Sequence, residues 1–215
     1  MSTTELRSDP ELSSSFAQRF PALGTEWEAN DAPEPTEVVI NDDLAELLGI
    51  DVEWLHSPEG VAFLVGTNVP EGAMPIAMAY AGHQFGGYSP LLGDGRALLL
   101  GEVTKANGTV ADLHLKGSGR TPYSRGGDGL ATLAAMLREY LMAEAMHALS
   151  VPTSRALGVV TTVQAFSVSR WNVARSWLVS PPATFVWARS STQPARKATL
   201  SVTWSTTRSN VTTQS

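Results

Sequence analysis

Apolar residues recur at three- and four-residue intervals in one long stretch of the chain, 128–149. The spacing is held by four leucines: Leu130, Leu133, Leu137 and Leu141. One face of an α-helix has this period, and no glycine or proline interrupts the run after Gly129. The pattern therefore predicts a helix over 128–149, which the Val-Pro pair at 151–152 ends.

Shorter patterns predict the other elements of a mixed α and β domain. Asn41 stands where a helix N-cap is expected, and Gly49 stands where that helix would stop. Alternating apolar residues predict two strands, joined by a hairpin turn at Asn107-Gly108. The stretch 75–101 is dense in glycine and predicts close-turning backbone. The further elements expected are strands over 37–40, 97–103 and 112–116 and helices over 52–55 and 59–64.

Composition narrows the class of protein. The chain has 215 residues, 43% of them hydrophobic, and no cysteine, so it can form neither disulfides nor thiolate metal sites. The first residues are polar, and no segment approaches the roughly 18 continuous apolar residues of a membrane span. We expect a cytoplasmic protein without a membrane segment.

Charge divides the chain into two unlike parts. Residues 1–144 carry eight basic and 21 acidic side chains, a net charge of −13, whereas 145–215 carry seven basic and no acidic ones, a net charge of +7. An acidic body disfavours a broad basic face, so we expect no nucleic-acid partner.

The tail has an unusual composition. Residues 161–215 contain no glycine, 20 of these 55 residues are Ser or Thr, and four of the six tryptophans lie there. Disordered linkers avoid tryptophan, and ordinary cores are poorer in Ser and Thr, so the tail fits neither class.

Two glycine-rich loops contain the candidate chemistry. In the first, LGDGRA at 92–97, backbone amides and the Arg96 guanidinium could approach phosphate oxygens closely. The second loop, KGSGRTPYSRGGDG at 116–129, adds several cations and the carboxylate of Asp128. The alternative interpretations are an ordinary hairpin turn for the first loop and a solvated loop for the second.

Lys116 and Glu139 form the third candidate. A lysine on a strand that pairs with a glutamate on a helix is how kinases hold an ammonium group against nucleotide phosphates. Glu139 lies 23 residues after Lys116, on the predicted helix. The alternative is that Glu139 follows Arg138 on a solvated helix face.

The chain contains three long motifs: YAGHQFGGYSPLLGDGRALLLGE, LHLKGSGRTPYSRGGDG and REYLMAEAMHALSVPTSRAL. Together they resemble the selenoprotein O family of protein adenylyltransferases, and the likeness extends over about 16–162. The resemblance implies a kinase-like fold that binds ATP and magnesium and transfers AMP to hydroxyl side chains of proteins. It places Gly93, Gly95, Arg96, Lys116, Asp128 and Gly129 at the nucleotide, with Lys116 and Glu139 as the catalytic pair.

The chain departs from the family pattern in two places. Leu130 stands where the family usually has a further arginine, so one cation is lost near the loop. After Thr162 the likeness stops, and the two later nucleotide arginines, the catalytic base and the magnesium ligands of the family are not found. We therefore expect three regions: a flexible N-terminus over 1–15, a kinase-fold region over 16–162, and an unmatched tail over 163–215.

The tail has a possible genetic explanation. Read from the third base of each codon, 171–189 can encode the family's continuation, including the two later arginines. We hypothesise that a one-base slip between the codons for 161 and 170 put the tail out of frame, which the DNA sequence would test.

The fold expected is α+β, a partial N-terminal lobe of a protein kinase, followed by a disordered or non-native C-terminal segment. The function expected at the family level is protein adenylylation, with this chain an inactive truncated fragment. The alternatives are a non-catalytic module that binds a nucleotide or a partner, and a small protein kinase, which would lack its base and metal ligands.

Overall fold

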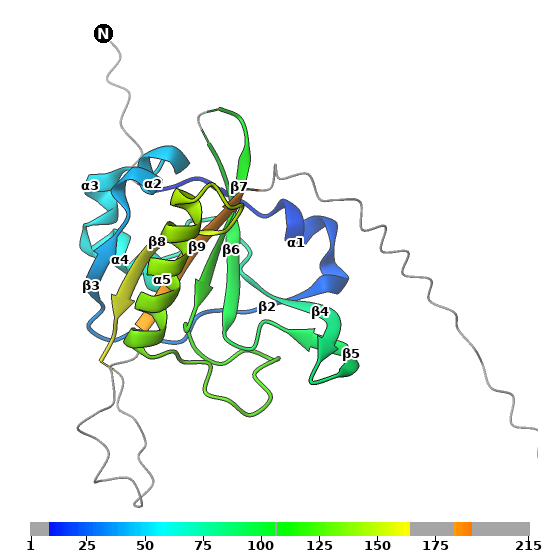
Figure 1. The fold of residues 1–215 in the computed structure, drawn as a ribbon. Helices are drawn as coiled ribbons and strands as arrows, with labels where there is room; N and C mark the ends of the chain where they lie inside the picture. Colours follow the sequence, from blue (N-terminus) through cyan, green and yellow to red (C-terminus); the bar gives the residue numbers. More distant parts are fainter. Residues whose placement is uncertain (1–8, 106, 164–182, 191–215) are drawn as a thin grey trace, which may run out of the picture.

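A computed structural model describes residues 9–105, 107–163 and 183–190 of the chain (Figure 1). Its strands are β1 (Leu12–Ser13), β2 (Gly24–Glu26), β3 (Thr36–Ile40), β4 (Ile76–Gln84), β5 (Gly87–Gly93), β6 (Ala97–Thr104), β7 (Val110–Lys116), β8 (Arg155–Thr161) and β9 (Ala183–Ser190). Its helices are α1 (Ser15–Arg19), the 3₁₀ turn η1 (Pro21–Leu23), α2 (Asp42–Leu48), α3 (Val52–Leu55), α4 (Pro58–Val65) and α5 (Leu133–Ala148). The α+β class is confirmed.

The strands form an antiparallel sheet in the order β2-β4-β6-β7-β9-β8-β3. Two strands lie beside this path, because β1 pairs with β6 and β5 pairs with β4. The predicted strands over 97–103 and 112–116 are β6 and β7, joined through the predicted turn at Asn107-Gly108, where Gly108 has φ +78°.

Helices cover the sheet on both faces. Helices α2, α3 and α4 pack on one face, where their leucines and Phe63 form the main core with Leu157 and Val160 of β8. Helix α5 packs on the other face, where Met136 contacts Ala156 and Val159 of the same strand. In Figure 1 α5 lies over β8 and β9, with α2, α3 and α4 grouped beside β3. No helix in the described residues is long and apolar enough to cross a membrane.

The helix ends follow the local sequence. The Asn41 side chain accepts a hydrogen bond from the Leu44 amide at 3.1 Å and caps α2, and Gly49 ends this helix with φ +75°. Ser57 caps α4 in the same way, and Gly66 ends it with φ +82°. Both caps satisfy backbone groups that a helix end leaves unpaired, so the predicted helices are confirmed at nearly their predicted bounds.

Helix α5 begins later than predicted, at Leu133 instead of residue 128. Gly129 has φ +73°, which a right-handed helix excludes, and Leu130 forms an isolated β-bridge with Ser118. The residues 128–132 therefore belong to a loop that is tied to the sheet. Apolar periodicity alone could not reveal this, because Leu130 has the helical spacing.

The glycine-dense stretch 75–101 has the predicted close turn, but it also forms two strands that the glycines did not predict. It holds the long hairpin of β4 and β5, whose turn places Phe85 at φ +53° and Gly86 at φ +80°. Regular strands form here because the glycines lie at the turn and at register shifts, where a pleated pair tolerates them.

The two terminal segments also differ from expectation. The N-terminal residues 9–15 were expected to be flexible, but they include β1 and the start of α1. Both elements are held by Glu102 of β6, which accepts hydrogen bonds from the Ser13 hydroxyl of β1 at 2.8 Å and from the amides of Ser15 and Phe16 of α1 at 2.8 and 2.6 Å.

The tail was expected to be disordered or non-native. In its described part Ala183–Ser190 form β9, which lies between β7 and β8 and is antiparallel to both, so this part is ordered. The hypothesis that the tail is out of frame stays a prediction. The run Thr-Phe-Val-Trp has high β-propensity, and Val186 is fully buried in the core. The rest of the expected tail, 164–182 and 191–215, and the N-terminal residues 1–8 lie outside the described residues.

Candidate functional site

A cleft of about 600 Å³ opens between the β4–β5 hairpin, the first glycine-rich loop, the end of β7 and the side of α5. Its size lies in the range of small-molecule sites. The residues that line it are Tyr80, Gln84, Gly93, Asp94, Gly95, Arg96, Ala97, Lys116, Glu139, Ala143 and Ser154. Five of the seven residues singled out in the sequence thus meet in one cavity.

Lys116 and Glu139 form an ion pair in this cleft. The Nζ atom of Lys116 donates to both carboxylate oxygens of Glu139, at 2.7 and 2.6 Å. Both side chains are partly buried, with 26% and 39% of their surface exposed. Glu139 is therefore not merely part of a solvated helix face. Because an ammonium group has three N–H donors, the pair holds Lys116 in place and leaves donor capacity toward the cleft.

The two glycine-rich loops support each other. The Tyr123 ring packs so closely on Gly93 that a Cβ there would lie 2.3 Å from a ring carbon. The Thr121 hydroxyl donates to the Asp94 carbonyl at 2.6 Å, and the Ser124 hydroxyl donates to the Gly95 carbonyl. The second loop thus forms the support under the first, so it is more than a solvated loop.

Arg96 is the second cation of the cleft. The backbone at Arg96 is fixed by two contacts. The Arg96 carbonyl accepts a hydrogen bond from the Gly117 amide at 2.8 Å, and Ala97 pairs with Lys116 in the sheet. Its side chain is exposed, and no carboxylate of the described chain lies within salt-bridge distance of its guanidinium. An exposed cation in the same cleft as Lys116 suits an anionic ligand.

Asp128 and Gly129 lie apart from the lining. The Asp128 carboxylate accepts a hydrogen bond from the Leu130 amide at 3.0 Å, which shapes the loop. A Cβ at Gly129 would collide with the Gly119 carbonyl oxygen at 1.8 Å. The contacts of both residues are those of loop packing, and direct contact with a nucleotide remains a prediction.

Two ionisable residues of the cleft were missed in the sequence, Asp94 and Tyr80. Asp94 lies between the two glycines, and burial raises the pKa of its carboxyl, although a hydrogen bond from the Met78 amide opposes the rise. The Tyr80 hydroxyl donates to the Gly93 carbonyl at 3.3 Å, and burial raises its pKa also. Asp94 could have been found from its place inside the GDG motif. Tyr80 has no comparable signal, because only the hairpin fold brings it to the cleft.

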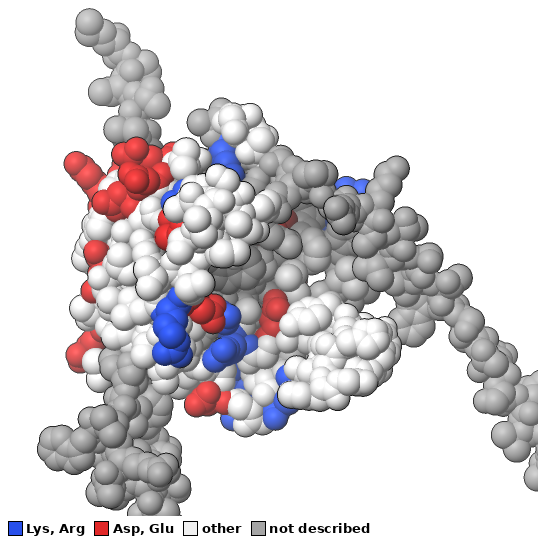
Figure 2. Space-filling model, viewed as in Figure 1, with Lys and Arg blue, Asp and Glu red and all other residues white. Residues whose placement is uncertain are grey.

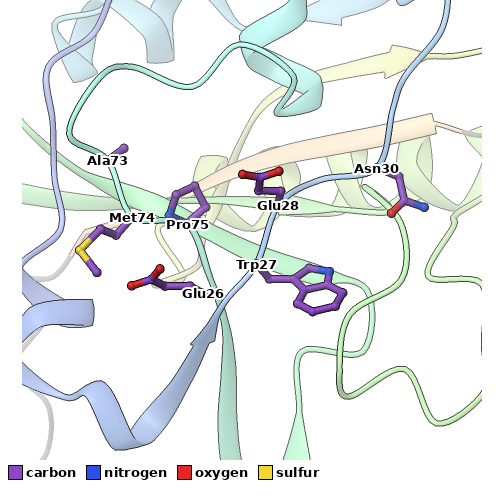
Figure 3. Close-up of a pocket in the computed structure, with 7 residues that line it drawn as sticks. All are labelled: Glu26, Trp27, Glu28, Asn30, Ala73, Met74 and Pro75. Carbon is purple, nitrogen blue, oxygen red and sulfur yellow. The ribbon is translucent and has the colours of Figure 1, made fainter.

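A second cavity, of about 590 Å³, lies beside the segment that follows β2 (Figure 3). Glu26 and Glu28 line it together with Trp27, whose indole N–H donates to the Arg120 carbonyl at 2.7 Å. Its lining contains two carboxylates and no cation, so it does not suit a phosphate. Neither Lys116 nor Glu139 reaches it.

The charges on the face shown in Figure 2 agree with an anionic ligand in the cleft that contains Lys116. Figure 2 shows Asp and Glu gathered over α2 and α3, whereas Lys and Arg gather below the middle of the same face. No group of three or more His, Asp or Glu side chains in the described chain could hold a metal ion. The cleft carboxylates do not fit a magnesium site made by protein ligands alone, because Glu139 is paired with Lys116 and leaves only Asp94.

Comparison with known proteins agrees with the motifs. The model of the family described as protein adenylyltransferase SelO matches residues 9–176, which is further than the 16–162 expected from the motifs. A protein nucleotidyltransferase YdiU of Mycolicibacterium smegmatis is 62% identical over 151 residues, or 70% of this chain and 31% of the relative. The protein of the same name in Pseudarthrobacter chlorophenolicus is 58% identical over 160 residues, which cover 74% of this chain and 33% of the relative. The one in Rhodococcus jostii is 60% identical over 153 residues, which cover 71% of this chain and 30% of the relative.

The matches thus cover about a third of the length of these relatives. The family model covers well over half of the present chain and includes every residue of the cleft. The chain therefore belongs to the protein adenylyltransferase SelO family.

Proposed function

We propose that this chain is the nucleotide-binding part of a protein adenylyltransferase and that its cleft takes the phosphates of ATP. The observation that carries the proposal is the Lys116–Glu139 ion pair, which holds an ammonium group beside the Gly93–Arg96 loop in a cavity of about 600 Å³. Similarity to proteins named nucleotidyltransferases supports it.

Each cleft group has a distinct task in this proposal. The ammonium of Lys116, oriented by Glu139, neutralises phosphate charge, and the Arg96 guanidinium can donate two hydrogen bonds to one phosphate. Gly93 and Gly95 keep side chains away, so that phosphate oxygens can approach the backbone. The Asp94 carboxyl accepts a hydrogen bond from the Met78 amide at 3.2 Å, so its task is to hold the loop against β4.

The reaction proposed for the whole enzyme is AMP transfer to a protein hydroxyl. The hydroxyl oxygen of a Ser, Thr or Tyr substrate bonds to the α-phosphorus, and the bond from that phosphorus to the oxygen bridging to the β-phosphate breaks. Pyrophosphate leaves, and a base takes the hydroxyl proton. The family resemblance puts the base and the magnesium ligands after Thr162. We therefore propose that the 215-residue chain binds ATP but transfers no AMP unaided.

One observation favours a second function, a module that binds a partner without catalysis. The β4–β5 hairpin exposes Phe85 completely, and Tyr88 and Leu91 are more than 60% exposed. Single exposed apolar residues are common on protein surfaces, but three on one hairpin suit a protein contact.

A titration with ATP tests the proposal. We expect saturable binding with a Kd on the order of 0.1–1 mM, because few contacts are available. Lys116→Met should weaken binding about tenfold, in line with the loss of a charged hydrogen bond. Lys105→Met removes a lysine outside the cleft and should leave the Kd unchanged.

Each result has a definite meaning. If ATP does not saturate the chain, or if both lysine variants bind equally well, the nucleotide site is wrong. Labelling of a protein by ATP that carries a labelled α-phosphate would contradict the lack of unaided transfer, without affecting the binding site. Saturable binding of a protein but not of ATP would favour the partner-binding module.

A further inference from the structure

Helix α5, which contains Glu139, packs on the sheet through a narrow apolar seam in which Leu133, Ala135, Tyr140 and Ala143 are partly buried beside Met136. Of its 16 residues only Met136 is fully buried. Leu141 and Met142 remain 67% and 57% exposed. Apolar burial attaches a helix to a sheet but is not directional, so a narrow seam of this kind leaves the rotation of α5 to be set by polar contacts.

Two carboxylates of α5 supply further attachments. Glu139 bonds to Lys116 at the end of β7, as described above. Glu144 bonds to Arg155 at the start of β8, with 3.1 Å from Nε to Oε1 and 2.5 Å from Nη2 to Oε2. This second pair is bidentate and more buried than the first, since its side chains are 16% and 24% exposed. Paired, planar geometry of this kind makes a strong and directional contact.

The two attachments act on different sides of the helix. Residues five positions apart are separated by about 7.5 Å along a helix axis and by about 140° around it. A contact at Glu139 alone would let α5 rotate or tilt about that point. With Glu144 also fixed, both the rotation and the axial position of the helix are determined.

A buried polar junction reinforces the second attachment. The Ala156 amide donates to Glu144 at 3.4 Å, and the Asn41 side chain donates to the Ala156 carbonyl at 3.2 Å. Burial alone would raise the pKa of Glu144, but bonds from Arg155, Asn41 and the Ala156 amide outweigh it and lower the pKa. Glu144 is therefore held as a carboxylate at neutral pH.

We propose that Glu144 and Arg155 are positioning residues, which set α5 so that Glu139 meets Lys116. Neither of them lines the cleft, so they act on it only through the helix. This proposal deepens the proposed function, because it concerns the same cleft. It can be tested on the protein without nucleotide.

The reactivity of Lys116 toward an amine-acylating reagent measures this coupling. The Lys116 nitrogen is acylated slowly while it is bonded to both oxygens of Glu139, because it must leave the carboxylate to meet the reagent. In the full chain, labelling of Lys116 is read by mass spectrometry relative to Lys105 as internal reference. Glu139→Gln should raise the ratio roughly two- to fivefold, the size expected for a partly exposed ion pair. Glu144→Gln should raise it about twofold, although Glu144 does not touch Lys116.

Further variants separate positioning from general loss of stability. The charge exchange Glu144→Arg with Arg155→Glu should return the ratio toward its original value, because it restores the attachment. Val61→Ala lowers stability on the opposite face and should leave the ratio unchanged, and so should Glu46→Gln, which removes an exposed helical carboxylate. All variants are labelled well below their urea midpoints, so that each is folded.

The proposal is overturned if Glu144→Gln leaves the labelling ratio unchanged while Glu139→Gln raises it. It is also overturned if Val61→Ala raises the ratio as much as Glu144→Gln, because the effect would then be general. The labelling needs no ATP, so a failure to bind nucleotide would contradict the proposed function and leave this result intact.

Discussion

The helices on the two faces of the sheet are attached by different forces. In α4 five of eight residues are buried, including Phe63 and Leu64, whereas in α5 one of 16 is buried. Helix α5 also packs on a smaller apolar cluster around Met136, and in addition it forms ion pairs to β7 and β8. One layer is held mainly by apolar burial, and the other combines less apolar burial with directed polar contacts.

The two kinds of attachment have different consequences, one for the stability of the fold and the other for the orientation of α5. Apolar burial contributes most of the free energy of folding and is insensitive to small rotations of a helix. Ion pairs contribute less but fix direction. A helix that must present a carboxylate to Lys116 therefore gains from polar attachment, and the comparison can be tested by substitutions on each face.

The largest loss of folding stability is expected from a substitution of Phe63 on α4. Its ring is fully buried and lies 5.6 Å from the Trp54 ring. Phe63→Ala should lower the free energy of unfolding by about 3–5 kcal/mol, the usual cost of such a cavity. Urea unfolding followed by circular dichroism measures it, with the exposed Leu47→Ala as control. A loss below about 1 kcal/mol would show that this face is not the main core.

A smaller effect is expected at Met136, the one fully buried side chain of α5. Its neighbours Ala131, Ala156 and Val159 are small and can close part of the gap. Met136→Ala should therefore cost about 2 kcal/mol, at the low end for such substitutions. The same urea experiment measures it. A loss equal to that of Phe63→Ala would mean that both faces are equally packed and would remove the contrast.

Sequence predicted the elements that short-range chemistry determines. Asn41 and Gly49 bound α2 because capping is a local property, and alternation located β6 and β7 for the same reason. The Lys116–Glu139 pair could be predicted because a known arrangement of strand and helix suggested it, and the structure brings the two side chains together.

The rest depends on long-range contacts that sequence pattern does not reveal. Strand β9 pairs with β7 and β8 across gaps of more than 20 residues, and Tyr123 supports Gly93 from a separate loop. The Glu144–Arg155 pair was missed because each residue looks like an ordinary solvated charge. Only the short connection from α5 to β8 places them together.

A modest effect on the free energy of unfolding, dependent on pH, is expected from a substitution of His56. This residue links the α2–α4 layer to β3. Its ring nitrogens bond to Glu37 at 2.8 Å and to Asp42 at 2.9 Å. These bonds, Asp42 first, raise the pKa of His56 above its ordinary value despite partial desolvation. The raised pKa means that the stabilisation is complete below about pH 6.5 and is lost as pH rises through the folded-state pKa.

The test compares the native chain with His56→Gln at pH 5.5 and 8.5. Glutamine keeps polarity but cannot become charged, so the native chain should be more stable at pH 5.5 by less than about 1 kcal/mol and nearly equal at pH 8.5. A difference that is the same at both pH values would show that the charge of His56 has no part in the attachment.

The smallest effect is expected at Leu141 on the outer side of α5. Its side chain is 67% exposed, and alanine has a slightly higher helix propensity than leucine. Leu141→Ala should change the free energy of unfolding by less than about 0.5 kcal/mol and leave the Lys116 labelling ratio unchanged. A loss above about 1 kcal/mol would mean that this side of α5 is covered in solution and that apolar contact helps to hold it. A change in labelling without a loss of stability would instead mean that the helix position depends on more than its two carboxylates.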